Sequence, residues 1–98
     1  MDKRVKLIRN NLLPIEDIKK IALHAQGWKL RLTAVNSISY AETLEKVVLN
    51  DDNWKVRLAA LRKITNLQVI EEVIFNESNA NVIAEAKNIL LNLSEWEK

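Results

Sequence analysis

The chain of 98 residues has no cysteine, one glycine and one proline. Without cysteine it can form neither disulfide bonds nor thiolate metal sites. With so little glycine and proline, it lacks the residues from which the tight turns of β-sheet proteins are built. Aromatic residues make up 5% of the chain and hydrophobic residues 48%, so aliphatic side chains must form most of the core. These shortages predict an all-α domain.

Other shortages limit the chemistry that the chain can support. Its only histidine, His24, falls in a predicted turn. A nitrogen- or sulfur-rich metal site needs several His or Cys side chains, and a serine nucleophile needs a base beside it. A phosphate-binding loop needs several glycines. We therefore predict no catalytic, metal-binding or cofactor-binding residues, and no enzymatic activity.

Long hydrophobic runs and a strong net charge are also missing. Charged residues interrupt each apolar stretch well short of a membrane span, and the N-terminal residues lack the apolar run of a signal peptide. We expect a cytoplasmic protein that does not contact a membrane. The net charge of +2 is too small to predict a polyanionic partner.

The charge is unevenly distributed along the chain. Residues 1–31 hold eight Lys or Arg against three acidic residues, whereas residues 68–98 hold six acidic residues against two lysines. A solvated surface with chance asymmetry is one interpretation, and end-to-end self-association or a charged partner is the other. We expect a monomer, with end-to-end association as the alternative.

The sequence repeats with a period of 26 residues. When 28–53 is aligned with 54–79, ten positions are identical, and they include one tryptophan position and one arginine position. The same register gives a more divergent unit at 2–27. Terminal units are expected to diverge because they face water on one side. We predict one domain, 1–98, built of units 2–27, 28–53, 54–79 and a truncated capping unit, 80–98.

Each unit contains two stretches with helical periodicity. In 54–65, Val56, Ala60 and Ile64 recur at every fourth residue, and the apolar arc is wide enough for a helix that is covered on more than one side. A second helix is predicted at roughly 67–75. Asn, Asp and Ser dominate the turns at 50–53 and 76–79, where they suit helix ends. The units are therefore predicted to be helix pairs.

Segment 50–61, NDDNWKVRLAAL, is similar to the HEAT-like helical repeats, whose hallmark is an Asp-rich turn followed by Val-Arg and by small and aliphatic residues. The resemblance extends over nearly the whole chain. The period of 26 is shorter than the roughly 40–47 residues of typical HEAT and armadillo units, and is closer to the variant leucine-rich helical repeats. The resemblance implies a right-handed α-solenoid with an open face for a partner, and no chemistry by itself.

Two arginines lie within the apolar arcs of the first helices. A charge there must be paired, so partners are expected for both Arg31 and Arg57. The turn before each helix is predicted to supply the carboxylates, which for Arg57 are Asp51 and Asp52, with Glu77 after it. In HEAT-like proteins equivalent Asp and Arg residues form a ladder between neighbouring units. The resemblance implies this structural role here, with ligand binding as the alternative.

The tryptophans are predicted to stabilise the repeat array. Trp28 and Trp54 are one period apart and should pack between neighbouring units, with base stacking as the alternative. Trp96 is predicted to close the C-terminal end of the array.

Two surfaces are candidates for partner binding. The outer face of the second helices has mixed but largely acidic charge, which favours a protein partner with basic groups. Its residues are Lys19, Lys20, Glu42, Glu45, Lys46, Gln68, Glu71 and Glu72.

The alternative surface is a basic ridge along the first helices, which would bind the phosphates of a nucleic acid. Its residues are Lys3, Lys29, Lys55, Arg62 and Lys63. The sequence thus predicts a non-catalytic protein–protein interaction or scaffold module, with nucleic-acid binding as the second hypothesis.

Overall fold

The computed structural model describes residues 2–96, and the side chains of residues 2–93. Helices are the only regular secondary structure in this part of the chain, so the all-α prediction is confirmed. They are α1 (Lys3–Arg9), α2 (Ile15–His24), α3 (Trp28–Ser37), α4 (Ala41–Asn50), α5 (Trp54–Leu61), α6 (Leu67–Asn76) and α7 (Ala80–Trp96). None of these helices is long and apolar enough to cross a membrane.

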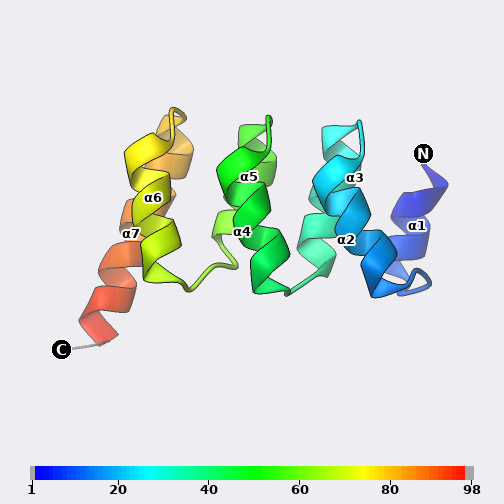
Figure 1. The fold of residues 1–98 in the computed structure, drawn as a ribbon, viewed down its shortest axis with the longest axis horizontal. Helices are drawn as coiled ribbons and strands as arrows, with labels where there is room; N and C mark the ends of the chain where they lie inside the picture. The colour runs from blue at the N-terminus through cyan, green and yellow to red at the C-terminus, as the bar shows by residue number, and fades with distance from the viewer. Residues whose placement is uncertain (1, 97–98) are drawn as a thin grey trace.

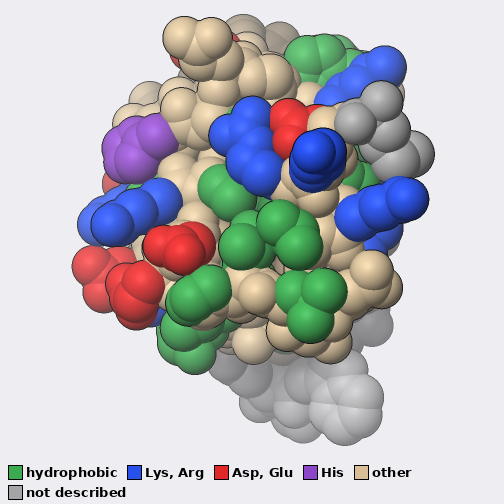
Figure 2. Space-filling model, turned by 90° about the vertical axis from the view of Figure 1, so that its right-hand side faces the viewer, with side chains coloured by type: hydrophobic (Ala, Val, Ile, Leu, Met, Phe, Trp, Pro, Cys, Tyr) green, Lys and Arg blue, Asp and Glu red, His purple; other side chains and the backbone are tan. Residues whose placement is uncertain are grey.

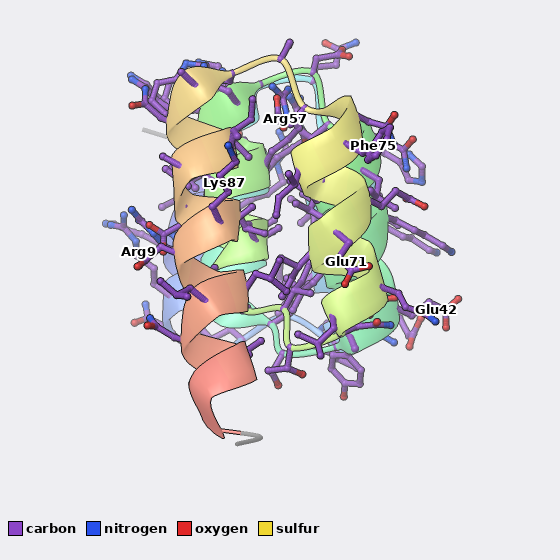
Figure 3. The ribbon with its side chains drawn as sticks, turned by 90° about the vertical axis from the view of Figure 1, so that its left-hand side faces the viewer. Arg9, Glu42, Arg57, Glu71, Phe75 and Lys87 are labelled. Carbon is purple, nitrogen blue, oxygen red and sulfur yellow. The ribbon has the colours of Figure 1, made fainter. Side chains whose placement is uncertain are left out.

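The helices form two layers (Figures 1 and 3). The first helices of the units, α1, α3, α5 and α7, pack side by side in one layer, and the second helices, α2, α4 and α6, form the other. Neighbouring helices within a layer are one unit apart in sequence. Each 26-residue unit is therefore displaced from the previous one along the long axis of the molecule. The molecule measures 44 × 26 × 18 Å.

The core lies between the two layers. On the second helices, the equivalent residues Ile18, Leu44 and Ile70 are 5%, 1% and 0% exposed. On the first helices, Ala60 and its equivalent Ala86 are both 0% exposed, and a side chain this small lets neighbouring helix backbones approach closely. The inward apolar pattern of the repeat therefore becomes one continuous core.

Two helices differ in length from the sequence prediction. Helix α5 ends at Leu61 instead of continuing to residue 65, because the backbone N–H groups of Lys63 and Ile64 bond to carbonyls three residues back and tighten the last turn. Helix α7 runs through the position at which the other units turn. Leu91 stands there in place of Ser39 and Thr65, and leucine is the stronger helix former. The side chain of Trp96, predicted to close this end, lies outside the described residues.

Asparagines cap the helices that follow two of the inter-unit turns. The side-chain oxygen of Asn53 accepts a hydrogen bond from the backbone N–H of Lys55 at 2.8 Å, and Asn79 accepts one from Asn81 at 2.9 Å. The equivalent position before α3 is Gly27, which provides no side-chain cap. One helix start of the repeat is therefore weaker than its copies.

Replacing Gly27 by asparagine is expected to raise the free energy of unfolding by about 0.5–1 kcal/mol, through a new cap and a less flexible unfolded chain. Gly27 has a φ of −83°, and no atom lies within 4 Å of an added Cβ, so the side chain fits. Urea unfolding followed by circular dichroism measures the change. The control is Gly27→Ala, which stiffens the chain without capping the helix; an equal gain in that variant would contradict the capping explanation.

Candidate functional site

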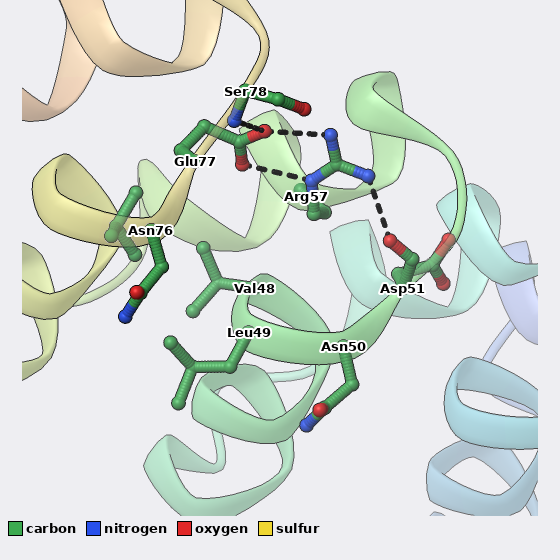
Figure 4. A pocket seen from close by; sticks show the side chains of 9 residues that line it. Val48, Leu49, Asn50, Asp51, Arg57, Asn76, Glu77 and Ser78 are labelled. Carbon is green, nitrogen blue, oxygen red and sulfur yellow. Dashed lines mark hydrogen bonds and ion pairs between the residues drawn. The ribbon is translucent and has the colours of Figure 1, made fainter.

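A ladder of charged side chains joins successive units at the edge of the molecule where the second helices end. Arg31 donates from Nε and Nη2 to the carboxylate of Asp51 at 2.8 and 3.1 Å, and from Nη1 to the carbonyl of Ala25 at 2.7 Å. One period later, Arg57 donates to the carboxylate of Glu77 at 2.9 and 2.7 Å, and to the carbonyl of Asp51 at 2.8 Å (Figure 4). The two rungs have the same geometry, and the prediction that both arginines are paired is confirmed. The predicted source of the carboxylate is wrong, because Asp51 and Glu77 lie in the turn that ends the unit of their arginine and not in the turn before its helix.

The ladder is largely withdrawn from solvent. The side chains of Arg31 and Arg57 are 13% and 15% exposed, and those of Asp51 and Glu77 are 4% and 5% exposed. Each guanidinium engages a carboxylate with two nitrogens, the strongest arrangement for such a pair. The predicted involvement of Asp52 differs from the structure, because Asp52 is exposed and the carboxylate that meets Arg57 belongs to Glu77. These contacts show that the ladder links successive units.

Glu77 titrates at an unusually low pH because of this ladder. Burial by itself would raise the pKa of Glu77, but hydrogen bonds from Arg57 and from the backbone N–H groups of Asn79 and Ser78 outweigh it. The pKa therefore lies below its ordinary value of 4.5. A carboxyl group whose pKa is lowered by folding stabilises the folded state at every pH above its unfolded value.

Acidification is therefore expected to remove part of the stability of the wild-type chain. The contribution of Glu77 is complete above its ordinary pKa of 4.5 and is lost as the pH falls through the lower folded-state value. Urea unfolding of the wild type and of Glu77→Gln at a series of pH values measures it. The difference between the two proteins should be largest near neutral pH and should shrink in acid; a constant difference would contradict the assignment.

The tryptophans pack against the core. Trp28 and Trp54 are both partly buried and contact it. The ammonium of Lys55 lies 5.3 Å from the centroid of the Trp28 ring and 5.8 Å from that of Trp54. At these distances the cation is attracted to both rings.

The basic ridge is only partly available. All five of its residues are exposed. The ammonium of Lys63, however, donates to the carbonyl oxygens of residues 35 and 38 at 2.9 and 2.8 Å, where α3 ends. Desolvation of the ammonium lowers the pKa of Lys63. A lysine that caps the preceding unit holds two units together, and the repeat gave no sign of it because the equivalent residue is a serine.

The eight residues predicted for partner binding all lie on the second helices. Six of them are exposed, while Lys19 and Glu45 are partly buried. The sign of the charge changes along the row of helices: at equivalent positions α2 carries two lysines, α4 one acid and one lysine, and α6 two acids. The ion pair between Lys46 and Glu42, at 3.4 Å, is fully solvated and contributes little stability. At these positions the face therefore offers lysines at one end and acids at the other. Helix α2 also carries Asp17 and Glu16, and Glu16 pairs with Lys19 at 3.2 Å.

The same face carries an apolar row that the sequence prediction missed. Phe75 is 91% exposed, Leu49 is 39% exposed and Leu23 is partly buried, and the three occupy equivalent positions in successive units. Figure 3 shows Phe75 projecting from α6 on the side of the molecule that also presents Glu42. The signal was present, because Phe75 follows Glu71 by four residues and so shares its helix face. We call Leu23, Leu49 and Phe75 the apolar row.

Hollows lie between the second helices, which contact one another less than the first helices do. A hollow of about 330 Å³ between α2 and α4 is lined by Leu23, Lys46 and Val47, among others. Another, of about 200 Å³, separates α4 from α6 and reaches the pair of Arg57 and Glu77 (Figure 4). These openings offer both apolar and charged contacts. Among the side chains of residues 2–93, no three His, Asp or Glu are placed to hold a metal ion.

The N-terminal end of the molecule is a further exposed surface. Figure 2 shows hydrophobic side chains at its centre, with basic and acidic side chains around them. The two helices at this end are joined by a loop whose Leu12 is 66% exposed, and they carry the partly buried Val5 and Ile21. Both signs of charge are present, so this end is not the uniformly basic surface that the charge count suggested.

Comparisons of the chain with models of protein families, with characterised proteins and with solved structures give no match. The similarity to HEAT-like repeats therefore stays a prediction from the sequence.

Proposed function

We propose that the chain is a cytoplasmic HEAT-like helical-repeat module, a right-handed α-solenoid, that binds a protein partner through the outer face of its second helices. The 26-residue period, the two layers of helices and the ladder between units support the architecture. The side chains of the ladder and of the core contact one another. A partner would therefore bind the outer surfaces of the two layers.

The observation that carries the binding proposal is the exposure of Phe75. A phenylalanine that is 91% exposed forgoes the hydrophobic stabilisation that burial would provide. Large apolar side chains surrounded by charged residues are typical of the energetic centres of protein interfaces. Phe75 has Glu71 and Glu72 one turn away and Leu49 at the equivalent position of the neighbouring helix. A partner that covers Phe75 would also contact Glu71, Glu72 and Leu49.

Affinity capture from the native lysate, followed by mass spectrometry, tests this proposal. The bait is the full chain, and the matched bait is Phe75→Ala, whose fold should be unaffected because the ring is exposed. We expect proteins that bind the wild type and are depleted on the variant. Leu91→Ala, at an exposed leucine of α7, serves as the control for general stickiness. Equal capture by all three baits would contradict the proposal.

Nucleic-acid binding along the first helices is the second candidate. It is supported by the composition of α1, α3 and α5, none of which contains an acidic residue. Against it, the ammonium of Lys63 is engaged with α3, and that of Lys55 lies 5.3 and 5.8 Å from the centroids of two tryptophan rings. Binding of duplex DNA or RNA that weakens steeply with salt would support this candidate, and no binding at low salt would remove it.

A further inference from the structure

We propose that the partner on this face is a second copy of the chain, and that the two copies meet through their second helices about a two-fold axis parallel to those helices. This inference rests on the proposed function and identifies its partner. Closed two-fold dimers require a surface that is complementary to itself. The charges at positions 19, 20, 45, 46, 71 and 72, the apolar row and the hollows of the second helices satisfy this requirement.

The charges of the outer helices are complementary under this rotation. An axis that runs parallel to α4, just outside its outer face, places α2 of one copy opposite α6 of the other, and keeps equivalent positions at the same level. The lysines of α2, Lys19 and Lys20, then face Glu72 and Glu71 of the second copy. A two-fold axis along the row of helices would instead place α2 on α2 and bring lysine against lysine. Charge therefore favours the first arrangement.

On the central helix, positions 45 and 46 are complementary to themselves in the same arrangement, whereas Glu42, whose side chain is 86% exposed, meets Glu42 of the second copy. Lys46 lies on the side of α4 that faces α2, where it lines the hollow between them. Glu45 occupies the position of Lys19, whose ammonium lies 4.0 Å from the ring centroid of Tyr40 in the following unit, so Glu45 is directed toward α6. The rotation exchanges these two sides, so Glu45 of each copy meets Lys46 of the other.

The apolar row pairs in reverse order. Leu49 meets Leu49 at the axis, and Phe75 of each copy lies opposite Leu23 of the other. Beside Leu23 is the hollow of about 330 Å³ between α2 and α4, which can receive the phenyl ring. The face is bounded by the two longer dimensions of the molecule, 44 and 26 Å, so it is large enough for the roughly 800 Å² per partner of a standard interface.

Cysteine cross-linking tests the position of the axis, because the chain has no cysteine of its own. Leu49→Cys should form a disulfide-linked dimer readily in a glutathione redox buffer, since the two sulfurs meet at the axis. Leu23→Cys and Phe75→Cys should form few dimers separately and many when mixed. Ser37→Cys, exposed at the end of α3 in the other layer, is the control and should not cross-link.

Sedimentation equilibrium tests the energetics. The wild type should form a closed dimer at low salt, and the affinity between the two copies should fall as the salt concentration rises. Phe75→Ala should raise the dissociation constant about a hundredfold, about tenfold for each of the two rings. Lys20→Glu and Glu71→Lys should each weaken the dimer by about tenfold or more, whereas the chain with both substitutions should return close to the wild type. Leu12→Ala removes an exposed leucine from the N-terminal end and should have no effect.

Several results would overturn the inference. The first is a mass that stays monomeric at the highest concentration. The second is cross-linking of Leu49→Cys that is no faster than that of Ser37→Cys. The third is a double charge variant that dimerises more weakly than either single variant. Masses that grow beyond the dimer and depend on Leu12 would place self-association at the ends instead. A monomer whose Phe75 still governs capture from lysate would refute the second copy but leave the proposed function standing. A dimer that captures nothing else would make self-association the whole of that function.

Discussion

Replacing Arg57 by alanine is expected to lower the free energy of unfolding by about 3–5 kcal/mol. The substitution leaves the carboxylate of Glu77, 5% exposed, without the two charged hydrogen bonds that compensate for its burial. It also frees the carbonyl of Asp51, which accepts from the same guanidinium. Since domains of this size are stable by about 5–15 kcal/mol, the loss is a large part of the total. Urea unfolding followed by circular dichroism measures it.

Two further variants separate the ion pair from other effects of the substitution. Arg62→Ala removes an exposed arginine just beyond the end of the same helix and should change stability by no more than about 0.5 kcal/mol. Arg57→Met combined with Glu77→Met should recover much of the loss, because an apolar pair leaves no buried charge without a partner. If Arg57→Ala melts within a degree of the wild type, the ladder does not stabilise the fold.

Ile70→Ala is expected to cost about 2–5 kcal/mol, because it opens a cavity in a fully buried part of the core. Ile70 is 0% exposed and lies on α6, which packs between α4 and α7. The matched control is Phe75→Ala on the same helix, which removes a larger side chain that is 91% exposed and should cost no more than about 0.5 kcal/mol. Parallel urea unfolding of the two variants and the wild type gives both values.

The contrast between these two residues tests the inward and outward faces of the second helices. A small loss for Ile70→Ala would mean that the core closes around the vacated space. A large loss for Phe75→Ala in the monomer would mean that the ring stabilises the fold, and the apolar row would then lose its role as a binding surface. The predicted pattern is a strong effect from the smaller residue and almost none from the larger one.

Helix periodicity was predictable because it depends on local spacing. The repeated apolar positions predicted the helices and their buried faces, and Ile70, Val56 and Ala60 are all 0% exposed. The second helix of the third unit was predicted at roughly 67–75 and spans Leu67–Asn76. The end of α5 was predicted less well, since the apolar pattern continues to Ile64 although the backbone has already tightened into a turn.

Contacts between units were predictable only where the repeat itself encodes them. Arg31 and Arg57 recur in register, so their need for partners was visible in the sequence. Lys63 has no counterpart in the other units, and only the folded chain brings its ammonium to carbonyls of residues more than 20 positions away. A single long-range contact of this kind leaves no periodic trace.

By itself, the sequence determined an all-α chain of repeated helix pairs, because composition and periodicity act through local backbone preference and the burial of one helix face. The tertiary structure decided which carboxylate pairs with which arginine, and which apolar residues stay in water. Both depend on distances between units that are far apart in the chain. Helix periodicity places Phe75 on the same face as Glu71, but only the packing of the second helices left its ring 91% exposed.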